Sequence, residues 1–216
     1  MLVCDTPQYD KLYAPWLEHP HTLLAEGGYN PQKDRLLDLC GGSGVQTLAA
    51  LRVASWVWDP KEIVLFDMNP RLHTDTSHVR MVRGDAHYLD QYFNPESFDL
   101  VACRQALGYL DPTVVFPHVH QVLAPRGRFV FNTFAKPSRA SVDAYPYDGD
   151  HFAEGHVFLF GRVLHAQIKL TGVGRGFDLS LFQYHSESKL RAAADGLFQC
   201  QVTKKGRSLH WVCTKA

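Results

Sequence analysis

The residues best suited to chemistry in this sequence form a glycine-rich stretch, Asp38 to Gly44, that reads DLCGGSG. A short apolar run precedes this stretch and a helix-like run follows it, so it is expected to form the turn between a strand and a helix. Backbone N–H groups in such a turn can approach a ligand closely, because glycine lacks a Cβ atom. The chemistry of that turn therefore depends on which ligand it holds.

Two common ligands of glycine-rich turns fit this one poorly. A phosphate-binding P-loop needs a Lys-Ser or Lys-Thr pair after its last glycine, whereas Val45 and Gln46 follow Gly44. The dinucleotide fingerprint G-x-G-x-x-G is matched at Gly42 and Gly44, but Thr47 occupies the place of the third glycine. The turn therefore argues against a P-loop and favours a dinucleotide only weakly.

Elements of alternating type would hold this turn in place. Strand-like segments are expected over 35–40, 62–67, 79–85, 98–103 and 127–134, and helical segments over 44–55 and 112–123. Strands that alternate with helices predict an α/β fold with a parallel sheet and helices on both of its faces. In the first helix, Val45, Leu48 and Leu51 are expected to form the buried face.

The pattern changes after Phe134. Residues 135–155 are expected to be a loop, 156–170 and 177–186 two strands, and 187–195 a helix. The last segment is a predicted hairpin, in which apolar residues alternate on each arm around the turn KKGR. These residues are Phe198, Cys200 and Val202 on one arm and Leu209, Trp211 and Cys213 on the other. Residues 1–216 are interpreted as one domain with short helices over 1–34 and an insertion over 135–186.

With these elements assigned, the sequence resembles the class I S-adenosylmethionine (SAM) dependent methyltransferases. DLCGGSG is similar to their first motif, D-x-G-x-G-x-G, with Cys40 in place of the first glycine. The next four motifs resemble, in order, VLFDMNP, VRGDAH, FDLVACRQALGYL and HQVLAPRGRFVFNTF. The resemblance implies a three-layer Rossmann-like sheet that is mostly parallel, with an antiparallel C-terminal hairpin strand and a β-rich insertion after the fifth strand.

The resemblance also implies that SAM is the cofactor and that the glycine turn holds it. Gly42 and Gly44 would let the backbone approach the methionine part, and Asp38 would fix the turn and reach the ammonium group through water. Asp67 would accept hydrogen bonds from the ribose hydroxyls, as an acid does in dinucleotide sites, and Asp85 would accept from the adenine amino group. The other residues assigned to the cofactor are Cys40, Met68, Ala86, Arg104 and Tyr9.

A general base is needed only if the methyl acceptor carries a proton at neutral pH, because the sulfonium of SAM already makes the methyl group a good electrophile. The catalytic candidates are Tyr109, which follows the fourth strand, and His185, which ends the last strand of the insertion. His151 and His156, expected in a loop, are two more. A purely structural role is the alternative for each of the four.

Two segments are expected to enclose the acceptor. The aromatic-rich insertion over 135–186 would roof the site, and an enclosed apolar pocket suits a small organic molecule. The segment 1–34 would supply either a lid over the site or a docking helix with core aromatics, namely Tyr9, Tyr13 and Trp16. A two-stranded ribbon over 157–185 with one apolar face cannot stand free in water, so it lies on the main sheet, over the site or in a homodimer interface.

The predicted reaction is therefore the transfer of a methyl group from SAM to an oxygen or nitrogen atom of a small organic molecule. Methylation of RNA or protein, and SAM binding without catalysis, are the alternatives. Lys and Arg together number 22, as do Asp and Glu. This balance argues against a nucleic-acid partner held by many phosphate contacts.

The cysteines, histidines and apolar runs bear on compartment and cofactors. The five cysteines are odd in number and contain no C-x-x-C pair, so we expect reduced thiols and a cytoplasmic protein. No metal is expected, because His118 and His120 are two residues apart and no zinc-like ligand spacing occurs. Residues 1–13 lack the features of a secretory signal, and no apolar run approaches the ~20 residues that span a bilayer. We therefore expect no membrane partner.

Overall fold

The computed structural model describes residues 21–42, 44–55, 61–68, 70, 79–134, 142–147, 150–159, 162–170, 177–205 and 208–216. In the inserted segment 142–183 this description covers the backbone only. Tyr9, Tyr13 and Trp16, which are expected in the segment 1–34, lie outside these ranges.

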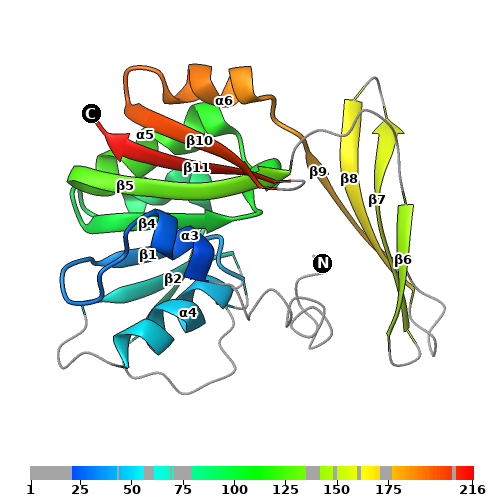
Figure 1. Ribbon diagram of the computed structural model, residues 1–216, viewed down its shortest axis with the longest axis horizontal. Coiled ribbons are helices and arrows are strands. Elements are labelled where there is room, and N and C mark those ends of the chain that lie inside the picture. Colours follow the sequence, from blue (N-terminus) through cyan, green and yellow to red (C-terminus); the bar gives the residue numbers. More distant parts are fainter. Residues whose placement is uncertain are drawn as a thin grey trace.

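A seven-stranded sheet forms the main body of the molecule, in the order β10-β11-β5-β4-β1-β2-β3 (Figure 1). Its strands are β1 (Leu36–Leu39), β2 (Ile63–Asp67), β3 (Val79–Arg83), β4 (Phe98–Arg104), β5 (Leu123–Phe134), β10 (Phe198–Lys205) and β11 (Ser208–Lys215). Strands β1 to β5 are parallel, whereas β11 runs antiparallel to both β5 and β10. The predicted mostly parallel sheet with an antiparallel hairpin strand is confirmed.

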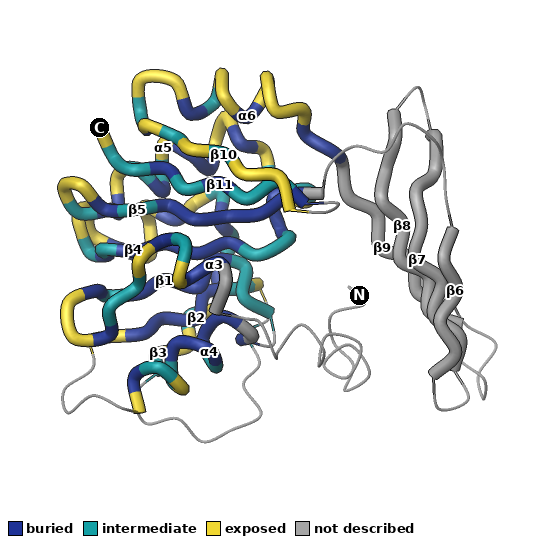
Figure 2. Tube along the Cα trace, in the orientation of Figure 1, coloured by how far each residue is buried: buried dark blue, intermediate teal, exposed yellow. Residues whose placement is uncertain are grey.

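Helices cover both faces of this sheet. Successive side chains of a strand point to opposite sides, and here the side chains on both sides are apolar. Leu36 belongs to an apolar cluster with the helices α3 (His21–Glu26) and α4 (Val45–Ala54). Leu37 and Leu39 belong to the other cluster, with α5 (Pro112–Val122), α6 (Glu187–Ala194) and the 3₁₀ segment η2 (Ala86–Gln91). Figure 2 shows the central strands buried along their length, as expected for parallel strands covered on both faces.

The buried face of α4 differs from the prediction. Leu48 and Leu51 are only half-buried, whereas Thr47 and Ala50 are fully buried. Small side chains allow the helix to lie close to the sheet, and the hydroxyl of Thr47 is satisfied by a hydrogen bond to Asp38. Leu51 still packs against the apolar cluster, and the side chain of Val45 lies outside the described part of the protein. Hydrophobicity alone does not indicate the fully buried Thr47, because this position is polar and paired.

A second sheet contains four antiparallel strands in the order β6-β7-β8-β9. They are β6 (Val142–Tyr147), β7 (Asp150–Leu159), β8 (Arg162–Leu170) and β9 (Phe177–Gln183). This sheet follows β5 in the chain and leads into α6, and Figure 1 shows it beside the main sheet. The predicted β-rich insertion is present at this place.

Two details predicted for the insertion are wrong. The expected loop over 135–155 contains β6 and much of β7, and the expected single strand over 156–170 is part of a hairpin with Leu159 opposite Arg162. A continuous apolar run does not reveal whether it forms one strand or two paired strands. Pro146 lies in β6, the edge strand, where a missing N–H group is tolerated.

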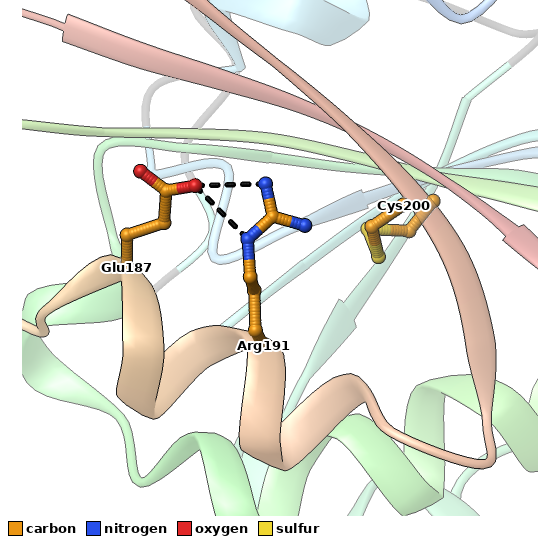
Figure 3. The surroundings of a disulfide bond; sticks show 4 residues. Glu187, Arg191 and Cys200 are labelled. Atoms are coloured by element: carbon orange, nitrogen blue, oxygen red, sulfur yellow. Dashed lines mark hydrogen bonds and ion pairs between the residues drawn. A yellow bond between two sulfur atoms is a disulfide. The ribbon is translucent and has the colours of Figure 1, made fainter.

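The β10–β11 hairpin has the predicted alternation, with Val202 opposite Trp211 and Cys200 opposite Cys213. These two cysteines form a disulfide bond (Figure 3). The expectation that all five cysteines are reduced is therefore wrong for this pair, because pairing register brings together residues 13 positions apart. The disulfide also removes one of the grounds for expecting a cytoplasmic protein.

Helix α6 covers this hairpin. Arg191 donates hydrogen bonds of 2.7 and 2.9 Å to the Glu187 carboxylate (Figure 3). Its guanidinium also lies 5.5 Å from the ring centroid of Trp211. The i,i+4 pair holds the guanidinium in place over the indole. Within the described part of the chain, no helix is both long and apolar enough to cross a membrane.

Candidate active site

Parallel strands bring the predicted site residues to one edge of the main sheet. Leu39 of β1 pairs with Phe66 of β2, so Asp67 lies beside the start of the glycine turn. Asp67 in turn pairs with Arg83 of β3, two residues before Asp85. The carboxyl ends of the strands thus carry both acids next to the turn, which is where open parallel sheets bind ligands.

The turn between β1 and α4 has the backbone geometry that its glycines were expected to permit. Gly42 has a φ of 53° and Gly44 a φ of 78°, and Gly44 is the N-cap of α4. Cys40 also adopts a positive φ, 54°, a conformation that is uncommon for a residue with a side chain. The N–H group of Gly42 donates to Asp67 Oδ2 at 3.0 Å, which joins the turn to the end of β2.

Gly41 is a turn residue that the sequence analysis did not single out. A Cβ atom at this position would contact the side chain of Leu65 and lie 2.6 Å from the Asp38 carboxyl carbon. The requirement for glycine therefore comes from packing within the turn and against β2. The doubled glycine in the sequence is the signal that could have identified it.

Asp38 is buried beneath the turn, with 1% of its surface exposed. Its Oδ2 atom accepts hydrogen bonds from the backbone N–H and the hydroxyl of Thr47, at 2.9 and 2.8 Å. Burial raises the pKa of Asp38 to about 6, although the Thr47 bonds oppose this rise. Its Oδ1 atom is buried and has no hydrogen-bond partner within the protein, so its capacity to accept a hydrogen bond is unused.

Asp85 lies at the other end of the site, as the N-cap of η2. Its Oδ1 atom accepts from the backbone N–H of His87 at 2.9 Å and lies 2.8 Å from His87 Nδ1. The His87 backbone N–H, and with it the imidazole, holds the pKa of Asp85 below its usual value. Ala86, the first residue of η2, is buried, whereas the side chain of Met68 beyond β2 is 61% exposed.

The segment that follows β4 leaves the sheet at the same edge as the glycine turn. Arg104, the last residue of β4, is half-buried, and its charge partly offsets the rise in the pKa of Asp38. The next residue, Gln105, has a φ of 53° and donates its N–H to Asn132 Oδ1 at 3.0 Å. A short 3₁₀ turn, η3 (Leu107–Tyr109), then presents Tyr109, which is 36% exposed.

His185 connects the four-stranded sheet to this segment. Its Nε2 atom lies 2.9 Å from the carbonyl oxygen of Leu107 and 3.1 Å from that of Leu110, so it donates to both. The side chain is buried, and burial with the nearby charge of Lys189 lowers the pKa of His185. The ring is therefore neutral, and only Nδ1, which is buried without a partner, is left as an acceptor.

The other two histidine candidates belong to the four-stranded sheet. His151 and His156 belong to β7, opposite Leu170 and His165 of β8, so the prediction that they lie in a loop is wrong. Their side chains, and Tyr9 as a whole, are outside the part of the protein that is described. Among the described residues, no group of three His, Cys, Asp or Glu side chains could hold a metal ion.

Comparison with known families agrees with this arrangement. A family model described as a methyltransferase domain matches residues 10–172. The chain belongs to this methyltransferase family. No curated protein matches the sequence of this methyltransferase, so the remaining comparisons are with solved structures.

Solved structures share the fold of this methyltransferase at low sequence identity. A SAM-dependent methyltransferase from Clostridium acetobutylicum is 17% identical with a TM-score of 0.68, over 96% of each chain. SAM-bound CalS10, an amino pentose methyltransferase from Micromonospora echinaspora, is 18% identical with a TM-score of 0.67, over 98% of each chain. The sugar N-methyltransferase KedS8 from Streptoalloteichus is 16% identical with a TM-score of 0.64, over 96% of this chain and 92% of that one. The predicted Rossmann-like methyltransferase fold is confirmed.

Proposed function

We propose that this methyltransferase transfers a methyl group from SAM to an oxygen or nitrogen atom of a small organic molecule. The observation that carries the proposal is the buried Oδ1 atom of Asp38, which has no protein partner and lies under a turn joined to Asp67. A buried acceptor of this kind is costly unless a donor reaches it. The ammonium group of SAM supplies such a donor, either directly or through water.

The other residues at this edge fit the remaining parts of SAM. Asp67 now accepts a hydrogen bond from the Gly42 N–H. With SAM bound, its carboxylate would accept from the ribose hydroxyls, either in place of this bond or in addition to it. Asp85 would accept from the adenine amino group, and the exposed thioether of Met68 would cover the purine ring. We also propose contacts from Cys40, Gly42, Gly44, Ala86, Arg104 and Tyr9.

SAM supplies the activated methyl group, and the protein supplies position. The acceptor atom must be held ~3 Å from the methyl carbon, in line with the bond that breaks, and water must be excluded. The segment from Arg104 to Tyr109 faces this task, because it leaves the sheet at the same edge as the glycine turn. Where a proton has to leave, Tyr109 is the most accessible described candidate for the base, with His185 and His151 as the others.

A small acceptor is favoured over a polymer by charge and by the insertion. Basic and acidic residues number 22 each, whereas a protein that holds RNA through many phosphates needs an excess of positive charge. The four-stranded sheet approaches the acceptor side through the contacts of His185 with the segment around η3. Names of two similar structures, an amino pentose methyltransferase and a sugar N-methyltransferase, suggest amino sugars as the first acceptors to try.

The proposal is tested in two steps. S-adenosylhomocysteine should raise the melting temperature more than NADH or ATP do, because a ligand that binds only the folded state stabilises it. Methyl-labelled SAM should then transfer label to members of an amino sugar and aromatic amine panel but not to bulk RNA. A larger shift with NADH would refute the cofactor, and label in RNA alone would refute the acceptor class.

A further inference from the structure

His87 lies between two segments of the site, and its imidazole contacts both. Its Nδ1 atom is 2.8 Å from Asp85 Oδ1, and its Nε2 atom accepts the backbone N–H of Asp111 at 3.2 Å. Asp111 is the N-cap of α5, two residues after the η3 turn that carries Tyr109. One side chain therefore links the segment after β3 to the segment after β4.

The contact with Asp111 fixes the tautomer of this imidazole. A backbone N–H group can only donate, so Nε2 has to be the unprotonated nitrogen of the ring. The ring proton is then on Nδ1, where it points at the Asp85 carboxylate. The histidine thus acts as a donor toward Asp85 because it acts as an acceptor toward Asp111.

This arrangement fixes one oxygen of Asp85 and leaves the other for a ligand. Oδ1 receives both the backbone N–H and the imidazole N–H of His87, at 2.9 and 2.8 Å. The Asp85 side chain is 40% exposed and that of His87 is 30% exposed, so the pair is accessible from solvent. A carboxylate anchored through one oxygen presents the other in a single direction, which is what recognition of one amino group requires.

We propose that His87 is a positioning residue that orients Asp85 for recognition of the 6-amino group of the cofactor's adenine. The inference rests on the proposed function, since it takes the ligand next to Asp85 to be the adenine of SAM. His87 does not itself contact the ligand in this proposal. His87 affects the choice between nucleobases, because a carboxylate that is free to rotate distinguishes an amino group from a carbonyl less well.

A second histidine provides a matched control. His118 of α5 lies 3.2 Å from Asp90 of η2, and so also joins η2 to α5 through an imidazole–carboxylate contact. Its side chain is 24% exposed, close to the 30% of His87. Neither His118 nor Asp90 is a predicted ligand contact. Loss of the contact between them should therefore loosen the same two elements without turning Asp85.

The experiment compares S-adenosylhomocysteine with S-inosylhomocysteine, in which a carbonyl replaces the 6-amino group. Calorimetry would give Kd for both ligands with the full-length wild type, His87→Ala, His87→Asn and His118→Ala. The selectivity for adenine is the Kd of S-inosylhomocysteine divided by that of S-adenosylhomocysteine. This ratio should fall about five- to tenfold in His87→Ala, the change expected from one misaligned hydrogen bond. It should stay within about twofold of wild type in His87→Asn, whose amide can still donate to Asp85, and in His118→Ala.

Each outcome bears on the proposal. An unchanged ratio in His87→Ala, or an equal fall in His118→Ala, would overturn the positioning role of His87 and leave the proposed function intact. A wild-type protein that binds both ligands equally would overturn the role of Asp85 and, with it, the present inference. Failure of the wild type to bind S-adenosylhomocysteine at all would refute the proposed function as well.

Discussion

Two acids in neighbouring strands of this site have different environments. Asp38 is 1% exposed and has its pKa raised to about 6, with one oxygen held by Thr47 and the other without a partner. Asp67 ends the next strand, is half-buried and accepts from the backbone of Gly42. Burial therefore makes the protonation of Asp38 depend on pH near 6, and Asp67 is the acid that we propose to accept from the ligand's hydroxyl groups.

Loss of the proton from Asp38 should make the ligand-free protein less stable as pH rises. Its pKa is 3.8 unperturbed and about 6 when folded, so the folded state binds the proton more tightly than the unfolded state. That contribution is complete below about pH 4, is lost between about pH 4 and 6, and amounts to on the order of 3 kcal/mol. Urea unfolding at several pH values should show this loss in the wild type but not in Asp38→Asn. Parallel pH profiles for the two proteins would contradict it.

Removal of the Asp67 carboxylate should weaken cofactor binding without unfolding the protein. Its hydrogen bonds to ligand hydroxyls are charge-assisted, so Asp67→Ala should cost ~1.5–3 kcal/mol of binding free energy for S-adenosylhomocysteine. The fold should persist, because this residue is at a strand end outside the apolar clusters. Calorimetry on the variant measures the loss, and Asp67→Asn is the control of similar size. Unchanged affinity in Asp67→Ala would exclude this residue from the site.

At the scale of elements, the closing hairpin is held both by packing and by a covalent bond. Trp211 is fully buried and stacks on Phe131 of β5 with 5.3 Å between ring centroids. Cys213 is also fully buried and is bonded to Cys200 of the neighbouring strand. The hairpin thus completes the sheet on the side away from the glycine turn.

Breaking the hairpin disulfide should destabilise the fold. The bond closes a loop between residues 13 positions apart, and loops of about this length contribute roughly 3 kcal/mol through the unfolded state. A reductant, or the change Cys200→Ser, should therefore lower the melting temperature. The reductant should have no further effect on the Cys200→Ser variant. A wild-type melting temperature that is insensitive to reductant would contradict the prediction.

At the scale of the whole molecule, two sheets are joined close to the site. The seven-stranded sheet carries the glycine turn and the strand-end acids, and the four-stranded sheet leads from β9 into α6 through Tyr184 and His185. The two hydrogen bonds of His185 attach this junction to the carbonyl groups of Leu107 and Leu110. The insertion is therefore anchored to the segment that bears Tyr109.

The role of His185 can be tested by comparing two variants. If it joins the sheets, His185→Leu should lose about 1–3 kcal/mol of stability, because it removes the donor from buried carbonyl groups. His185→Gln should retain most of this stability and most of the methyl transfer, since an amide can donate in place of Nε2. Unfolding curves and turnover are the measurements. Loss of activity in both variants at wild-type stability would instead identify His185 as the base.

Local patterns predicted the main sheet and the placement of the acids. The alternation of β1, α4 and β2 depends on apolar periods within short segments, and these were recognisable in the sequence. Asp67 and Asp85 were assigned to the site because their segments resemble the family's second and third motifs, in which an acid follows a strand. The positive φ angles of Gly42 and Gly44 also follow from local chemistry.

Contacts between distant segments were decided only by the tertiary structure. The link from His87 to Asp111 spans 24 residues, and the tautomer that aims the imidazole at Asp85 exists only once that link forms. The disulfide depends on the register of two strands, and the buried face of α4 depends on Asp38 satisfying Thr47. Sequence patterns record each residue's own preference, whereas these features arise from pairs of residues that meet only after the chain has folded.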